Sequence, residues 1–410
     1  MPLTKLVTDN PEVVPPPEPP VKNPVRGIPP RLFIIVCSLL VLTVLSAGAV
    51  LYFLKSQNSA DSPKAQTGIV RPDWDKVSQD AKPDVSGTVA SPINGLLYTE
   101  DQAKVWENRR PMAVMVNNHV EARPYHAGLA EADLIYEAVA EGGIPRLLAI
   151  YHSKTPEKVG SIRSARVYYV DWAKEYDAWY AHWGGAQIDP NDPAVCNPAA
   201  DAFSHMRNVF VSSLDEYIIG EAAYWRESKP NLATEHTGYA SVPKLYQAGY
   251  DLYPDQKKEY RPVESWQFKE DSPKDKRPEK MSFSFNFWDD TDYAVTWEYD
   301  PANNEYRRSQ GGQSHLDSVT KKQLTAKNVI VVFMPETKFF DKKAHLQYGT
   351  LGKGKAEVFL DGQAVEAKWV RPTVEDRTKF FDLKGKEISF NRGPVWIEVL
   401  PLEQTVTVNQ

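Results

Sequence analysis

The sequence predicts a chain of the α/β or α+β class, in which a mixed N-terminal domain is followed by a smaller, mostly antiparallel β domain. Two observations support this class. Between residues 92 and 254, apolar runs typical of strands alternate with stretches of helical periodicity, whereas after Met281 strand-like runs recur between tight turns such as Asp361-Gly362. The chain has 410 residues, 42% of them hydrophobic, which is enough for two such domains.

The first 91 residues predict a membrane anchor. Residues 1–31 are rich in proline and are expected to form a disordered cytoplasmic tail. Residues 32–54 carry no charge between Arg31 and Lys55, and about 20 apolar residues suffice for a transmembrane helix. Cleavage as a signal peptide is the alternative, because Ala47-Gly48-Ala49 resembles a cleavage site. With the helix retained, the chain crosses the cell membrane once, and residues 55–91 form a flexible tether to an extracytoplasmic body.

The N-terminal domain is expected over residues 92–254. Residues 112–116 predict a buried strand that leads into Asn117 and Asn118. Residues 134–138 and 147–151 alternate in polarity around Gly142-Gly143, which predicts a hairpin. Ser161 is the expected N-cap of a helix over residues 162–176. A further strand is predicted at 178–183, and further helices near 214–226 and 240–247.

A charged linker or surface excursion is expected over residues 255–280, which are crowded with charge and proline. The C-terminal β-rich domain then covers residues 281–402. Its predicted strands lie at residues 283–288, 293–299, 329–334, 356–360, 364–370, 387–390 and 395–400.

The composition excludes several classes of function. A net charge of −6 argues against a nucleic-acid partner, because such proteins need a basic surface. The two cysteines are too few for a disulfide framework or a thiolate metal site, and no histidines are closely paired, so no metal is expected. Residues 349–355 resemble a P-loop, but Ala356 replaces the required Ser or Thr, and no cofactor is expected.

A cluster of arginines predicts an anion-binding site. Arg163 and Arg166 are three residues apart at the start of the predicted helix, where backbone N–H groups are unpaired, so phosphate, pyrophosphate or a uronate could bind there. The candidate ligand-binding residues are Asn117, Asn118, Arg123, Arg146, Ser161, Arg163 and Arg166. The alternative is that these arginines form structural ion pairs with Glu137, Glu141 or Asp171.

Three side chains are candidates for acid or base catalysis. Glu137 and Glu141 are four residues apart, hence on one face if both lie on one strand. His182 follows a predicted strand and precedes Gly184-Gly185, although a lone histidine is also common as a structural residue. The sequence is compatible with an enzyme and with a non-enzyme.

The order of several motifs resembles the YerB-like lipoprotein family of bacteria. These motifs are Asn117-Asn118, Ala122-Arg123-Pro124, residues 132–138, Glu141-Gly142-Gly143, Arg146, residues 160–166 and His182, with residues 327–331, 352–356, 361–362 and 396–399 in the C-terminal domain. The resemblance implies a two-domain extracytoplasmic protein of the bacterial envelope and no particular activity. One departure is that Val50, not cysteine, follows Ala47-Gly48-Ala49, so this member is expected to be anchored by its helix and not by lipid.

Three functions remain open at this point. The first is a membrane-anchored module that binds an anionic, phosphate-containing envelope ligand through the arginines. The second is an enzyme that acts on phosphorylated cell-wall or lipid-linked substrates. The third is a non-catalytic scaffold that docks an envelope protein partner such as a hydrolase.

Overall fold

The computed structural model describes residues 79–107, 109–254, 260–288, 290–339 and 341–409. The predicted cytoplasmic tail, the predicted transmembrane helix at 32–54 and most of the predicted tether lie outside these residues. Among the helices of the described part, none has the length and apolar character of a membrane span. All described residues belong to one compact unit.

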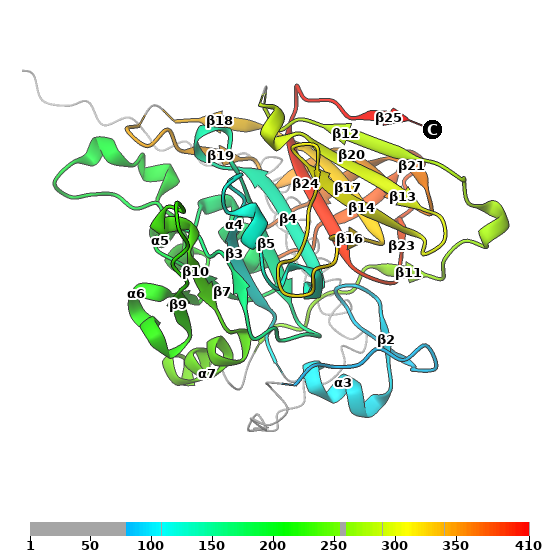
Figure 1. Cartoon of the computed structure of the whole chain (residues 1–410), viewed down its shortest axis with the longest axis horizontal. Helices are drawn as coiled ribbons and strands as arrows, with labels where there is room; N and C mark the ends of the chain where they lie inside the picture. The colour runs from blue at the N-terminus through cyan, green and yellow to red at the C-terminus, as the bar shows by residue number, and fades with distance from the viewer. Residues whose placement is uncertain (1–78, 108, 255–259, 289, 340, 410) are drawn as a thin grey trace, which may run out of the picture. The chain divides into compact units, whose positions relative to one another are not determined.

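A ten-stranded mixed sheet organises this unit, and it confirms the mixed fold class (Figure 1). Its strands follow one another in the order β22-β21-β20-β17-β24-β4-β5-β3-β7-β8. Their bounds are β3 Met112–Asn117, β4 Leu134–Val139, β5 Pro145–Tyr151, β7 Trp179–His182, β8 Ser213–Asp215, β17 Asn328–Met334, β20 Gly352–Leu360, β21 Gln363–Arg371, β22 Lys379–Asp382 and β24 Val395–Pro401.

Strand β24 joins the two predicted domains. It pairs in parallel with β17 on one side and with β4 on the other, so that Ile397 lies in register with Ile330 and with Tyr136. Every residue of β24 is buried, as expected for a strand covered on both faces. The two segments therefore share one sheet, although they are separate in sequence.

A second, antiparallel sheet is built from the C-terminal segment and packs on the first. Phe283, on β12, stacks on Phe359 of β20 with ring centroids 3.6 Å apart. Its strands are β12 Ser282–Phe285, β13 Val295–Asp300, β14 Glu305–Gln310, β15 Gln313–Ser314, β16 Thr325–Ala326 and β25 Thr407–Asn409. Along β12, β13 and β14, buried residues alternate with less buried ones, which is the period-2 pattern of a sheet with one covered face.

The remaining strands form smaller sheets. They are β1 Val89–Ala90, β2 Leu97–Tyr98, β6 Val159–Gly160, β9 Tyr224–Arg226, β10 Gly238–Ala240, β11 Gln267–Lys269, β18 Glu336–Lys338, β19 Leu346–Tyr348 and β23 Ser389–Asn391. The three-stranded sheet β6-β10-β9 lies beside the end of β3, because Val116 forms a bridge with Ile162, two residues after β6.

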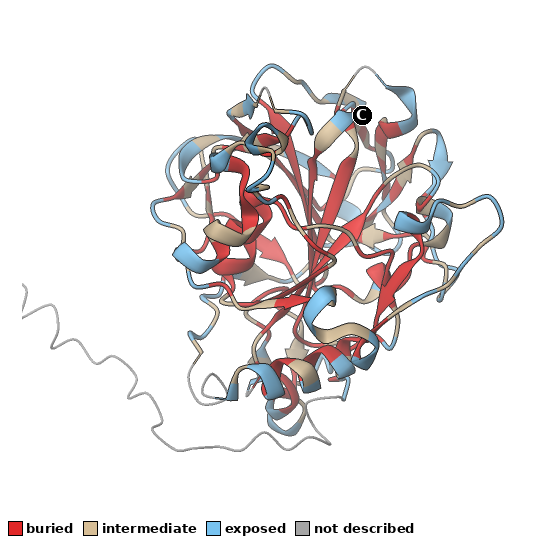
Figure 2. Cartoon of the chain, turned by 90° about the vertical axis from the view of Figure 1, so that its left-hand side faces the viewer, coloured by how far each residue is buried: buried red, intermediate tan, exposed pale blue. Residues whose placement is uncertain are grey.

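The helices are short and cover the sheet. They are α3 Glu100–Glu107, α4 Val167–Glu175, α5 Ala202–Asn208, α6 Glu216–Ile219 and α7 Val242–Leu252. Helix α4 is buried along its whole length, whereas α7 buries one face, as its spacing of apolar residues requires. In Figure 2 the central strands are coloured as buried, and several helices at the surface are coloured in part as exposed.

The structure confirms the hairpin, now β4 and β5, and the strand at 178–183, now β7. The predicted helix at 240–247 is α7, which continues to Leu252. The predicted helix at 214–226 is wrong: this segment divides into β8, α6 and β9, because two of its parts pair as sheet edges. The C-terminal strands are mostly antiparallel as predicted, but β24 pairs in parallel with β17 and β4, and β23 pairs in parallel with β11.

Candidate functional site

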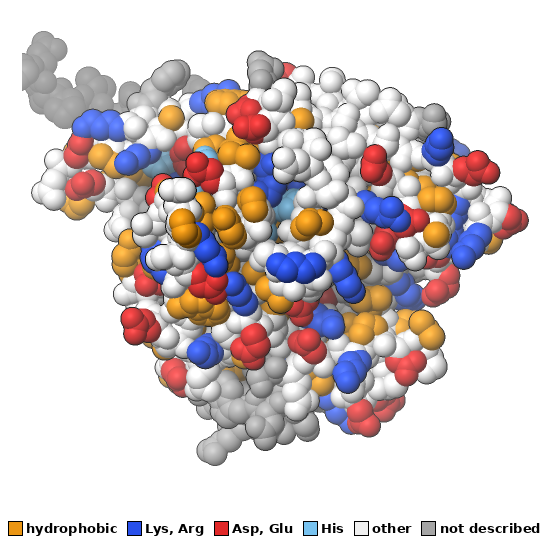
Figure 3. Space-filling model, viewed as in Figure 1, with side chains coloured by type: hydrophobic (Ala, Val, Ile, Leu, Met, Phe, Trp, Pro, Cys, Tyr) orange, Lys and Arg blue, Asp and Glu red, His pale blue; other side chains and the backbone are white. Residues whose placement is uncertain are grey.

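A cavity of about 200 Å³ opens where β3 ends and β5 begins. Its lining residues are Asn117, His119, Glu141, Ile144, Arg146, Arg163 and His236. Three of the predicted ligand-binding residues and one predicted catalytic residue therefore meet here. Figure 3 shows basic and acidic side chains interspersed over one face of the molecule, so a group of cations around one cavity is a local feature.

Strand register brings the first pair of residues together. Asn117 is the last residue of β3, and Arg146 is its partner on the antiparallel strand β5. The segment after β6 runs extended beside the end of β3, where the N–H of Arg163 donates a hydrogen bond to the carbonyl of Met115. The cavity is thus framed by three extended segments whose backbones are hydrogen-bonded to one another.

This arrangement corrects the prediction that Arg163 and Arg166 open a helix capped by Ser161. Helix α4 begins only at Val167, and its N-cap is Arg166, which makes no side-chain cap. Residues 161–166 stay extended because Ile162 and Ala165 form β-bridges with Val116 and Gly185. The prediction of an anion site therefore rests on side chains and not on a helix terminus.

Glu141 neutralises part of the positive charge at the cavity. It lies in the 3₁₀ turn between β4 and β5, and its Oε2 accepts from Arg146 Nη2 at 2.8 Å and from Arg166 Nη2 at 2.7 Å. Burial alone would raise the pKa of Glu141, but the two arginines outweigh it and hold that pKa far below its ordinary value. Arg146 and Arg166 thus have the ion-pair partner that the structural alternative proposed.

Arg163 differs from these two arginines. Its side chain lines the cavity and is partly buried, yet within the described residues its guanidinium has no hydrogen-bond or ion-pair partner. Burial lowers its pKa, whereas the exposed carboxylate of Glu235 raises it. Arg163 is therefore a cation whose counter-charge is incomplete.

Two histidines complete the cavity, and sequence reasoning missed both. His119 follows β3 closely, so its position was visible in the sequence. His236 lies in the 3₁₀ turn Thr234–His236, which immediately precedes β10, and its Nδ1 contacts Asn117 Nδ2 at 2.6 Å. Burial, His119 and Arg163 together lower the pKa of His236, so this side chain is neutral at pH 7.

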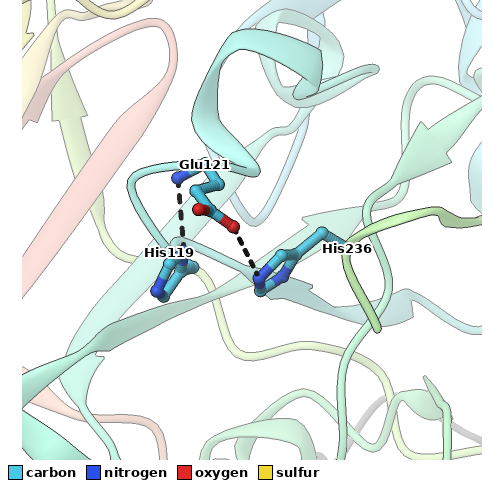
Figure 4. A group of neighbouring side chains, drawn as sticks. All are labelled: His119, Glu121 and His236. Carbon is cyan, nitrogen blue, oxygen red and sulfur yellow. Dashed lines mark hydrogen bonds and ion pairs between the residues drawn. The ribbon is translucent and has the colours of Figure 1, made fainter. Parts of the chain in front are cut away.

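His119, His236 and the nearby Glu121 are a possible metal-ligand set, which Figure 4 shows. The imidazole rings are stacked, with centroids 4.6 Å apart and planes inclined by 15°. A metal ion binds in the plane of each imidazole, about 2 Å from its nitrogen, so two stacked and nearly parallel rings cannot both ligate one ion. This arrangement is not that of a metal centre.

A second group, Cys196, Asp341 and His345, is also compact. The carboxylate of Asp341 already accepts from the backbone N–H groups of Asn197, Lys343 and His345. Burial raises the pKa of the Cys196 thiol to about 11, so it stays protonated at neutral pH. These hydrogen bonds fix the surrounding loops in place, so we interpret the group as structural.

The other predicted site residues lie away from the cavity lining. Asn118 donates to Glu137 and Gln310, and Arg123 contacts Asn118 and the carbonyl of Gln310, so both connect the N-terminal to the C-terminal segment. The hydroxyl of Ser161 is buried and has no partner among the described residues.

Two of the predicted catalytic residues have structural partners instead. Glu137 is fully buried and forms an ion pair with Arg308. His182 is fully buried between the carbonyl of Gly184 and the hydroxyl of Ser213, at 2.8 and 2.7 Å, and burial lowers its pKa. Of the three catalytic candidates, only Glu141 reaches the cavity.

Comparisons with known proteins agree with the resemblance seen in the sequence. The family models described as "Protein of unknown function (DUF3048)", N-terminal and C-terminal domain, match residues 95–253 and 283–397. A protein of Bacillus subtilis described as "Putative lipoprotein YerB" is 31% identical over 334 residues, which are 79% of this chain and 89% of that protein.

Solved structures point to the same family. The crystal structure of the YerB protein from Bacillus subtilis superposes with a TM-score of 0.65 at 26% identity, over 79% of this chain and all of the solved chain. The likeness therefore extends through both segments of the shared sheet. On this evidence the chain belongs to the YerB-like family, whose two domains are described as DUF3048.

Proposed function

We propose that this chain is a membrane-associated protein of the bacterial cell envelope that binds a phosphate-containing anionic ligand in the cavity. Arg163 carries the proposal. Its partly buried guanidinium has lost hydration without gaining a partner among the described residues. Burial of such an unpaired cation raises the free energy of the folded chain unless an anion binds to it. Arginine's planar fork binds phosphate oxygens through paired hydrogen bonds.

The proposed location rests on two independent supports. The relative at 31% identity is described as a lipoprotein, a class of protein held at a membrane. In this chain, the uncharged run at residues 32–54 is proposed as a single-pass anchor with the body outside the cell membrane. The cavity would then face wall polymers and lipid-linked phosphates.

The size of the cavity limits what it holds. Pockets for drug-sized ligands measure roughly 300–1,000 Å³, and this cavity of about 200 Å³ is smaller. It suits a phosphate or diphosphate group, with the rest of the ligand outside.

Titration calorimetry on the full chain in detergent tests this proposal, with pyrophosphate and a glycerol phosphate oligomer as probes. Arg163→Gln is expected to weaken binding at least tenfold, because a hydrogen bond to a charged group contributes about 1.5–3 kcal/mol. Arg207→Gln is the matched control, since Arg207 is exposed on α5 and, among the described residues, its guanidinium donates only to Ser204. Equal affinities of the two variants for both probes would remove Arg163 from the site.

An enzyme acting on phosphorylated substrates is the second candidate, and His236 favours it. Its buried imidazole lines the cavity and is neutral, so its N–H could stabilise, by a hydrogen bond, the negative charge that develops on a leaving-group oxygen. Glu141 is a poor proton donor because its pKa is so low. The measurement is release of inorganic phosphate from phosphorylated wall fragments, and a rate lost in His236→Gln with binding retained would establish turnover.

A further inference from the structure

The hydrogen bonds around the two cavity histidines determine where each ring carries its proton. The Oδ1 atom of Asn117 accepts from the backbone N–H of His119 at 3.0 Å, so the amide nitrogen Nδ2 must be the atom that faces His236 Nδ1. His236 Nδ1 is therefore an acceptor, and the proton of the neutral ring is on Nε2. His236 presents a donor on the side away from Asn117.

His119 is held in the same way. Its Nδ1 accepts from the backbone N–H of Glu121 at 3.2 Å, so Nε2 is the ring nitrogen that carries the N–H. No other described residue bonds to the His119 ring, apart from the stacking of His236 on it. Both histidines are thus donors through Nε2, and neither offers a free lone pair for a metal or for nucleophilic attack.

The carboxylate of Glu121 lies at one of these donors. Its Oε2 is 3.7 Å from His236 Nε2, which is too long for a hydrogen bond, and the side chain is 54% exposed (Figure 4). Glu121 forms no other side-chain bond to a described residue. An exposed carboxylate therefore lies near an N–H donor to which it makes no hydrogen bond.

The charges at the cavity also lack compensation. Three guanidinium groups, those of Arg146, Arg163 and Arg166, lie around the partly buried carboxylate of Glu141. Among these four described groups the excess is two positive charges, and the carboxylates that offset it, Glu121 and Glu235, are exposed to solvent. A ligand group with two negative charges matches this excess.

We propose that the cavity recognises a terminal phosphate group, as in a phosphomonoester or a pyrophosphate, which displaces the carboxylate of Glu121 and accepts from His119, His236 and Arg163. This inference rests on the proposed function and narrows its ligand class. A terminal phosphate has three free oxygens and up to two charges, and the donors come from three separate segments. A phosphodiester has one charge and two free oxygens, and a carboxylate has two oxygens in one plane, so neither gives each of the three donors an oxygen of its own.

The selectivity test uses calorimetry on the full chain in detergent. The probes are glycerol 3-phosphate as monoester, glycerophosphoglycerol as diester and glucuronate as carboxylate. The monoester is expected to bind at least about tenfold more tightly than the others, because each lacks one charge-assisted bond. Equal affinity for monoester and diester overturns the proposal.

The displacement test compares two exposed glutamates. Glu121→Gln is expected to strengthen monoester binding about threefold to tenfold, because it removes the competing carboxylate. Glu221→Gln makes the same charge change on an exposed residue of the turn after α6 and is expected to leave the affinity unchanged. An unchanged affinity in Glu121→Gln overturns the displacement.

The donor test separates a hydrogen-bond role from a merely structural one. His236→Gln keeps an N–H donor near the Nε2 position and is expected to retain affinity within about threefold, whereas His236→Leu loses about tenfold. Equal losses in the two variants overturn the donor role. The proposed function fails separately: it falls if no probe binds the wild-type chain, or if Arg163→Gln binds as the wild type does.

Discussion

At the scale of single residues, the most unusual feature is a pair of carboxyl groups in the core. Glu137 on β4 and Glu398 on β24 lie in register on adjacent strands, and both are fully buried. Arg308 forms an ion pair with Glu137, and the indole N–H of Trp297 donates to Glu398 at 3.0 Å. Burial and the negative charge of Glu137 raise the pKa of Glu398 well above its ordinary value. The folded chain therefore holds the Glu398 proton to a higher pH than the unfolded chain does.

This protonation links stability to pH. The folded chain keeps a proton on Glu398 that the unfolded chain releases above about pH 4.3, so the stabilising contribution is complete below that pH and falls as the pH rises. Glu398→Gln imitates the protonated carboxyl group and therefore removes this loss of stability at higher pH. We expect the Tm of the variant to exceed that of the wild type at pH 8, and the difference to shrink towards pH 5, in calorimetric melts.

Glu137→Gln is the contrasting change. It removes the charged partner of Arg308, which is fully buried, and is expected to cost about 3–5 kcal/mol of unfolding free energy at pH 7. Denaturant titration measures this cost. If both substitutions destabilise equally at pH 8, Glu398 is ionised in the folded chain and the assignment of the proton is wrong.

At the scale of elements, helix α7 shows how closely the helices approach the sheet. Gly249 lies on its buried face, and a Cβ atom there would come within 2.5 Å of two ring carbons of Trp179 on β7. Trp179 is itself buried and packs edge-on against Tyr250 of the same helix. The absence of a side chain at Gly249 therefore sets the spacing between α7 and β7.

Gly249→Ala tests this packing. Alanine improves intrinsic helix propensity by about 1 kcal/mol, but the clash with Trp179 is expected to reverse the sign and destabilise the chain by about 1–3 kcal/mol. Urea unfolding followed by tryptophan fluorescence measures the difference. Lys244→Ala, on the exposed face of α7, is the control and is expected to stay within about 0.5 kcal/mol of the wild type. A stabilised Gly249→Ala would show that α7 can move away from the sheet.

At the scale of the whole molecule, the two segments that match separate domain descriptions depend on one sheet. β24 forms seven register pairs with β17 and five with β4, so most of its residues are bonded on both sides. Buried polar contacts add to this connection: His126 Nδ1 lies 2.8 Å from His315 Nε2, and Arg308 reaches Glu137. Removing the C-terminal segment would expose a buried strand edge and leave the carboxylate of Glu137 without Arg308, its ion-pair partner.

A fragment that ends at residue 254 is therefore expected to lack a cooperative fold. The fragment loses β24, one of the two strands that pair with β4. All residues of β4 are buried in the intact chain, and an open apolar strand edge promotes aggregation. Size-exclusion chromatography and circular dichroism melts compare this fragment with the chain extending to residue 410. A monomeric fragment with a sharp melting transition would show that the N-terminal segment is an independent domain.

Local pattern was sufficient for several features of this molecule. The strand at 112–116 follows from its continuous apolar run, and the hairpin and the strands of the C-terminal segment follow from alternation and turn residues. All of these signals act over a few positions. The arginine-rich motif at residues 160–166 also marked the correct neighbourhood of the cavity. The helix start predicted from Ser161 is wrong, because the β-bridges of Ile162 with Val116 and of Ala165 with Gly185 override the local capping signal.

Long-range contacts decided the rest. His236 joins Asn117 across 119 residues, and no periodicity or motif connects them. The insertion of β24 beside β4 is likewise a pairing of distant strands, which local patterns do not specify. Charge partners follow the same rule: Arg146, Arg163 and Arg166 look equivalent in sequence, and only the folded chain gives two of them Glu141 and leaves the third in the cavity. Pairing of distant groups depends on the fully formed sheet, because the order and register of its strands decide which side chains become neighbours.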